Sequence, residues 1–246
     1  MLEGLKRLFG SAPAAPKAWE ALQPWADSRQ YVLREVKGAE GFVLDGKLGA
    51  VPWRLEWGAS QRHYISGTEL RMRAEMGLSS DLQLVLMNKA LQLQMEKAVF
   101  DQYVEGVQTR IDNQTPPEMR WLVMFPKLGA AEMGGLRERF AALGSMKNWL
   151  QQWLEGPLSE SLLARKLDAD TPFVLMIGRG RITLRMAMAE PEPRDLDPWL
   201  RVFETAMREA RRVAVAHSSG GESGSPSTQP SLWSASTMPP PGDAPR

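Results

Sequence analysis

The 246-residue sequence contains no cysteine, and this absence excludes disulfide bonds, thiolate metal sites and a cysteine nucleophile. Histidine is almost absent as well, with two residues in the whole chain. No HExxH motif, EF-hand loop or pair of histidines occurs, so the sequence indicates no metal site. We therefore expect neither a bound metal nor a cofactor.

Long apolar runs are also missing. No stretch approaches the roughly 20 apolar residues that span a bilayer, so we expect no transmembrane segment. The first 16 residues lack the long apolar core of a signal peptide, which favours a cytoplasmic location, in a bacterium by default. Residues 1–10 fit a short amphipathic helix, and weak peripheral contact with a membrane is an alternative to a frayed terminus there.

The chain has no excess of charge of either sign. Lys and Arg number 30 against 29 Asp and Glu, which leaves a formal net charge of +1. Such a balance supplies no long-range field for nucleic acid, and we do not expect a nucleic-acid partner. The hydrophobic fraction of 43% and the charged fraction of 24% are ordinary for a folded globular protein.

Sequence motifs of common enzymes are absent. There is no GxxxxGK[ST] phosphate loop and no GxSxG nucleophile motif. A Ser-His-Asp site would have to use His63, and an extended segment around this residue favours a structural or surface role. Glu56, Glu69 and Glu75 alternate with arginines, which favours cross-strand charge pairing over acid–base catalysis. Whether the chain is an enzyme stays open.

The clearest pattern that is present lies between residues 171 and 190. Phe173 to Ile177 form a continuous apolar run, which is typical of a strand buried on both faces. After the turn at Gly178-Arg179-Gly180, apolar and polar residues alternate, which predicts a second strand with one apolar face. We predict a β-hairpin whose second strand has the apolar residues Ile182, Leu184, Met186 and Met188.

A second alternating segment runs from residue 69 to residue 76. Its apolar positions are Leu70, Met72, Ala74 and Met76, and its opposite side carries Glu69, Arg71, Arg73 and Glu75. We expect the charged side to face water or a polar partner. The segment shares Leu-Arg-Met with the hairpin, at residues 70–72 and 184–186, so two related lobes are an alternative to a chance match.

Shorter patterns predict the remaining elements. We expect helices over residues 88–107, 136–154 with a break near Gly144, and 199–216. Residues 120–125 alternate as a strand does, and residues 63–65 also fit an extended segment. Asp45-Gly46 is a dipeptide that favours a hairpin turn.

Together these elements predict an α+β fold, with antiparallel strands and helices packed mainly on one face, as one domain or as two related lobes. The expected division is a flexible segment at residues 1–16, an N-terminal α+β lobe at 17–113, a C-terminal α+β lobe at 114–216 and a disordered Ser/Gly/Pro-rich tail at 217–246.

Arginines on the predicted sheet faces are the candidate binding residues. If these faces converge, their planar guanidinium groups would form an anion or carboxylate site. The alternative is a solvated face on which the charges pair with one another. The candidates are Arg71, Arg73, Arg179, Arg181 and Arg185.

A patterned scaffold without a catalytic motif favours a non-enzymatic protein that binds another protein, as an adaptor or chaperone-like module. The 14 methionines fit such a role if they line a groove, although their positions also fit core packing. The alternative function is a sensor or enzyme for a small anionic ligand, held by the arginines named above.

Overall fold

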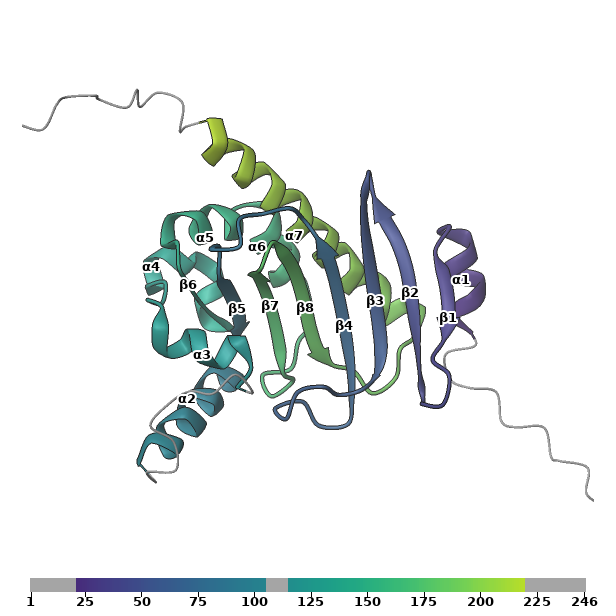
Figure 1. The fold of residues 1–246 in the computed structure, drawn as a ribbon, viewed down its shortest axis with the longest axis horizontal. Coiled ribbons are helices and arrows are strands. Elements are labelled where there is room, and N and C mark those ends of the chain that lie inside the picture. The colour runs from purple at the N-terminus through teal and green to yellow at the C-terminus, as the bar shows by residue number, and fades with distance from the viewer. Residues whose placement is uncertain (1–20, 105–114, 220–246) are drawn as a thin grey trace, which may run out of the picture.

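The computed structural model describes residues 21–104 and 115–219, and within them the fold is α+β, as predicted. Eight strands form one antiparallel sheet in the order β1-β2-β3-β4-β8-β7-β5-β6 (Figure 1). The strands are β1 (Val32–Glu35), β2 (Gly41–Leu48), β3 (Val51–Ala59), β4 (Thr68–Glu75), β5 (Leu84–Asn88), β6 (Phe140–Gly144), β7 (Phe173–Gly178) and β8 (Arg181–Ala187). The helices are α1 (Leu22–Ser28), α2 (Lys89–Val104), α3 (Pro117–Met124), α4 (Ala130–Met133), α5 (Lys147–Leu154), α6 (Pro157–Leu163) and α7 (Pro193–Ser219), with a 3-10 helix, η1, at Gly134–Glu138.

The predicted hairpin is confirmed as β7 and β8. Leu175 pairs with Leu184, and Ile177 pairs with Ile182, on either side of a two-residue turn. The turn residues, Arg179 and Gly180, have φ angles of +55° and +75°. A tight turn with two positive φ angles matches the right-handed twist of the strands that it joins.

Most helices cover one face of the sheet, and this face carries the larger hydrophobic core. Apolar residues from β2 to β8 pack there against α1, α4, α5, α6 and α7. Figure 1 shows α7 crossing the sheet obliquely. The apolar sides of β4 and β8 belong to this core, so Leu70, Met72, Leu184 and Met186 are buried as predicted.

The opposite face is covered over only part of its width. Helices α2 and α3 pack a second apolar cluster against β5, β6 and β7, through residues such as Met95, Trp121 and Met176. The neighbouring strands β8, β4 and β3 turn charged side chains to this same face. The sheet therefore has one fully covered face and one face divided between an apolar half and a charged half.

Asp45-Gly46 does not form a turn, contrary to the prediction. Both residues lie inside β2, and the chain reverses after Leu48. Gly46 pairs with Trp53, and a Cβ at position 46 would lie 2.2 Å from the Trp53 ring. Glycine is therefore required at position 46 because the aromatic ring of Trp53 on the next strand occupies the place of a side chain, and not because the chain turns there.

Two further predictions are wrong in the second half of the chain. Residues 117–124 form helix α3, because the buried residues Met119 and Leu122 follow a helical spacing of three. Residues 140–144 form β6, at the edge of the sheet, where they pair with β5. The helix expected over residues 136–154 is therefore confined to Lys147–Leu154, preceded by the short 3-10 helix.

The last helix is longer than predicted at both ends. It begins at Pro193, which suits the first helical position, and Pro198 lies inside it. Its start brings the fully buried Leu196 into the core. It ends at Ser219, so the predicted tail begins with three helical residues. The remainder of the tail, the N-terminal segment at residues 1–16 and the end of the helix predicted to residue 107 lie outside the described residues.

The segments that share Leu-Arg-Met are neighbours in the sheet. Strand β4 pairs with β8, with Leu70 opposite Met186 and Met72 opposite Leu184. Strand β5, from the first predicted lobe, lies between β7 and β6 from the second. The sheet therefore crosses the proposed boundary at residues 113 and 114, and the division into two lobes stays a prediction.

Candidate functional site

The charged face of β4 and β8 is partly buried, although the sequence indicated a solvated or partner-facing surface. Glu69 is 2% exposed and Arg185 is 8% exposed. A loop over residues 60–67 packs near them. The backbone N–H of Gln61 in this loop donates a hydrogen bond to Oε2 of Glu69 at 2.9 Å. This loop forms a turn at residues 62–65 and is not extended as predicted.

Two of the five candidate arginines pair with carboxylates beside β4 and line no common pocket with the other three, although Arg71 also lies 3.9 Å from Glu69. Arg71 and Arg73 both pair with Glu56 of β3, and the Arg73–Glu56 distance is 3.0 Å. Arg71 lines a separate hollow with Glu56 and Glu69, on the side of β4 that faces β3. These two residues therefore stabilise the charged half of the sheet.

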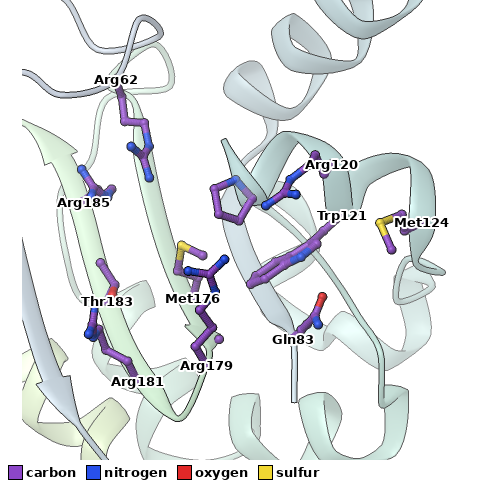
Figure 2. A pocket seen from close by; sticks show the side chains of 12 residues that line it. Arg62, Gln83, Arg120, Trp121, Met124, Met176, Arg179, Arg181, Thr183 and Arg185 are labelled. Atoms are coloured by element: carbon purple, nitrogen blue, oxygen red, sulfur yellow. The ribbon is translucent and has the colours of Figure 1, made fainter. Parts of the chain in front are cut away.

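The other three candidates, Arg179, Arg181 and Arg185, line one pocket. It has a volume of about 480 Å³ and lies between β7 and β8 on one side and α3 on the other (Figure 2). Two more arginines reach it: Arg62 from the loop after β3 and Arg120 from α3. We refer to it as the arginine pocket. Figure 2 shows guanidinium groups turned toward the same space from both walls, those of Arg62, Arg120, Arg179 and Arg185.

The rest of the lining is apolar or uncharged. Met176, Trp121 and Met124 supply apolar surface, and Gln83 and Thr183 supply neutral polar groups. Gly178 allows the Trp121 ring to approach β7, since a Cβ at position 178 would lie 2.8 Å from that ring. Among the described residues, no carboxylate and no histidine lines the pocket, so it contains no candidate for acid–base catalysis.

Three of the pocket arginines are held by carboxylates outside its lining. Arg185 donates to Glu69 at 2.5 Å, Arg181 donates to Glu75 at 2.6 Å, and Arg62 donates to Glu118 at 2.7 Å. The contacts at Glu69 and Glu118 are buried and hold Arg185 and Arg62 in place before any ligand arrives, whereas the exposed Arg181–Glu75 pair is weaker. The pocket is therefore preorganised along its sheet wall and at its loop.

The contact at Glu118 is the most deeply buried of the three. Glu118 is fully buried in the first turn of α3, and it also accepts a hydrogen bond from the Tyr64 hydroxyl at 2.5 Å. Burial, followed by the charge of Glu118, raises the pKa of Tyr64 well above its usual value, so the hydroxyl remains a donor. Burial opposes the charge of Arg62, but the neighbouring Glu118 carboxylate raises its pKa overall. This triad ties the loop to α3.

Arg120 and Arg179 differ from the other three, because neither has a carboxylate partner among the described residues. The Nε atom of Arg120 is buried and has no hydrogen-bond partner, and the same holds for Nε of Arg185. Arg179 occupies a left-handed turn position that usually takes glycine or asparagine. A strained position of this kind is enriched at functional sites.

Sequence reasoning missed Arg62 and Arg120. Arg120 was assigned to a strand, and its true place on α3 turns it toward β7 and β8. Arg62 lies in a loop whose sequence shows neither a helical nor a strand period. No sequence signal therefore associates it with Arg120 or with the hairpin arginines, which are more than 50 residues away. His63 does not line the pocket. Its ring packs edge-on against the Tyr64 ring, with 5.7 Å between the ring centroids.

No group of three or more potential metal ligands occurs within residues 21–104 and 115–219. None of the helices in these same ranges is both long and apolar enough to cross a bilayer. The chain matches no protein-family model, no curated protein and no solved structure.

Proposed function

We propose that this protein binds a small anionic ligand in the arginine pocket, as a sensor or binding protein and not as an enzyme. The observation that carries the proposal is a pair of arginines, Arg120 on α3 and Arg179 on the hairpin turn, that have no carboxylate partner within residues 21–104 and 115–219. They lie in a pocket that already holds three paired arginines. A volume of about 480 Å³ lies within the usual range for small-molecule sites.

The chemistry of arginine supports an oxyanion as the ligand. A guanidinium group presents two parallel N–H donors, which match the spacing of carboxylate and phosphate oxygens. Charge-assisted hydrogen bonds of this kind contribute about 1.5–3 kcal/mol each. Three of the five arginines are already oriented by Glu69, Glu75 and Glu118, so less conformational entropy is lost when the ligand binds.

We expect Arg120→Ala and Arg179→Ala each to lower the affinity for the ligand by about tenfold or more, because each removes at least one charge-assisted hydrogen bond. A thermal-shift screen of phosphorylated and carboxylated metabolites would find a ligand, and calorimetric titration would give its affinity for each variant. Arg137→Ala is the matched control, since Arg137 is an exposed arginine of η1 outside the pocket. A ligand that binds both pocket variants as tightly as the native chain would contradict the proposal.

A protein partner is the second candidate, and an apolar surface on α2 favours it. Leu93 and Phe100 are seven residues apart on this helix, so they share one side of it, and they are 63% and 65% exposed. Figure 1 shows α2 projecting from the body at the edge of the sheet. Exposed apolar side chains on one side of a helix would supply apolar area for contact with a partner. The expected bacterial, cytoplasmic setting belongs to this proposal as well.

The double variant Leu93→Asp, Phe100→Asp should lose a protein partner while it keeps the pocket intact. In a pulldown, a protein recovered by the native chain should be missing from the eluate of this variant. Anion affinity should be unchanged in the same preparation, because α2 does not line the pocket. Equal recovery by both chains would count against an interface on α2.

A further inference from the structure

The charges around the arginine pocket do not cancel. Five arginines line it, and three of them are each paired with one carboxylate, namely Glu69, Glu75 or Glu118; Glu69 also lies 3.9 Å from Arg71, whose nearer partner is Glu56. Arg120 and Arg179 have no carboxylate partner among the described residues, and they therefore leave a charge of +2 on the lining of the pocket. A ligand that carries two negative charges would balance this charge, whereas a monoanion would pair with only one of the two guanidinium groups. Arg120 is half-buried and Arg179 is exposed on the hairpin turn, so the stronger requirement for a counterion is at Arg120.

We propose that the ligand is a small phosphate monoester bound as its dianion, a proposal that rests on the anion-binding function proposed above. A phosphate monoester carries nearly two negative charges above its second pKa of about 6. It also has three terminal oxygens, which accept hydrogen bonds from several directions. A carboxylate carries one negative charge and two oxygens in one plane, so it brings one charge less and a narrower range of acceptor directions than a phosphoryl group.

The two unpartnered arginines approach from opposite walls of the pocket. Arg120 belongs to α3, Arg179 belongs to the β7–β8 turn, and Figure 2 shows the guanidinium of each directed into the space between these walls. Arg185 is more than nine-tenths buried, lines the same space and has an Nε atom without a partner. A tetrahedral phosphoryl group placed between the walls would supply acceptors to all three residues.

The pocket also has room and surface for an organic group. Met124, Met176 and Trp121 contribute apolar surface beside the arginines, and Gln83 offers an amide. Inorganic phosphate would leave this surface in contact with water. An ester with an apolar body of modest size would cover it and gain from its burial. Because the space is about 480 Å³, we assign it to a free small molecule and not to a phosphorylated protein.

Calorimetric titration with three probes of defined charge tests this assignment. Phenyl phosphate is a dianion at pH 8, phenyl sulfate has a similar shape and is a monoanion, and inorganic phosphate lacks the organic body. We expect phenyl phosphate to bind about tenfold or more tightly than phenyl sulfate at pH 8, since its second negative charge strengthens the hydrogen bonds that the arginines donate to the same three oxygens. We also expect it to bind more tightly than inorganic phosphate.

The pH dependence gives a second readout. Between pH 8 and pH 5 a phosphate monoester takes up a proton near its second pKa of about 6, and the affinity for phenyl phosphate should fall toward that for phenyl sulfate. The affinity for phenyl sulfate should stay constant over this range, because its charge does not change. Arg179→Gln lowers the local charge from +2 to +1, so it should reduce the preference for phenyl phosphate over phenyl sulfate. Far-ultraviolet circular dichroism would verify that the variant is folded.

The possible failures are distinguishable. Equal affinities for phenyl phosphate and phenyl sulfate at pH 8 would overturn the dianion assignment and leave the anion site itself in place. No binding of any of the three probes would contradict the anion site as well. A phosphotyrosine peptide that binds more tightly than phenyl phosphate would overturn the assignment to a small molecule.

Discussion

Replacing Glu69 with alanine is expected to lower the free energy of unfolding by about 3–5 kcal/mol. Glu69 is the buried partner of Arg185, which is itself 8% exposed, and the two side chains form the wall between the arginine pocket and the hollow on the β3 side. Alanine would leave the Arg185 charge buried without a counterion. The Gln61 amide would lose its acceptor at the same time. Urea unfolding followed by circular dichroism measures the loss.

Glu75→Ala is the matched control for this prediction. Glu75 lies on the same strand and the same face as Glu69, and it also pairs with an arginine of β8. Its side chain is 65% exposed, so its ion pair should contribute only about 0.2–1 kcal/mol. A loss in Glu69→Ala no larger than the loss in Glu75→Ala would show that burial does not determine the strength of these contacts.

Trp153→Ala should also lower the free energy of unfolding by about 3–5 kcal/mol, but for a different reason. Trp153 of α5 is completely buried in the larger core, and its indole N–H donates to the Ala206 carbonyl of α7 at 3.0 Å. Alanine would leave a cavity of nearly the size of an indole, and the Ala206 carbonyl would lose its side-chain donor. Because α5 and α7 pack together on the covered face of the sheet, the variant should unfold at lower temperature and lower urea concentration.

Two further variants separate the cavity from the hydrogen bond. Trp153→Phe retains a six-membered ring and loses the N–H donor with the rest of the indole, so we expect a smaller loss, of about 1–3 kcal/mol. Leu163→Ala removes an apolar side chain that is 40% exposed at the end of α6, and it should change the free energy of unfolding by less than about 0.5 kcal/mol. If Trp153→Ala were as stable as Leu163→Ala, the packing described for α5 and α7 would be wrong.

The sequence predicted which side of each central strand is apolar. In β4 and β8, alternation with a period of two assigns Leu70, Met72, Leu184 and Met186 to the core, and all four are buried there. Alternation is a property of neighbouring residues along the chain, so it can be interpreted without the rest of the fold. The same reasoning failed for residues 120–125, because a short apolar segment fits both the strand and the helix period, and most of it belongs to α3.

The candidate site was predictable only in part. Arg179, Arg181 and Arg185 were found because they lie at or after one hairpin, where sequence neighbours stay close in space. Arg71 and Arg73 were grouped with them, but their partner Glu56 comes from a strand on the other side of β4, and it draws them away. Strand order decides this difference, and strand order is not encoded in local alternation.

The chain alone therefore determined the hairpin, the apolar sides of the strands and the absence of thiol chemistry, because composition and short-range periodicity are sufficient for each of these. Only the tertiary structure decided that Glu69 and Arg185 are buried and that Arg62 and Arg120 meet the hairpin arginines. The physical reason is that burial and convergence depend on what covers the second face of the sheet. That cover is a loop and the helix α3, and they are brought to β8 by long-range packing.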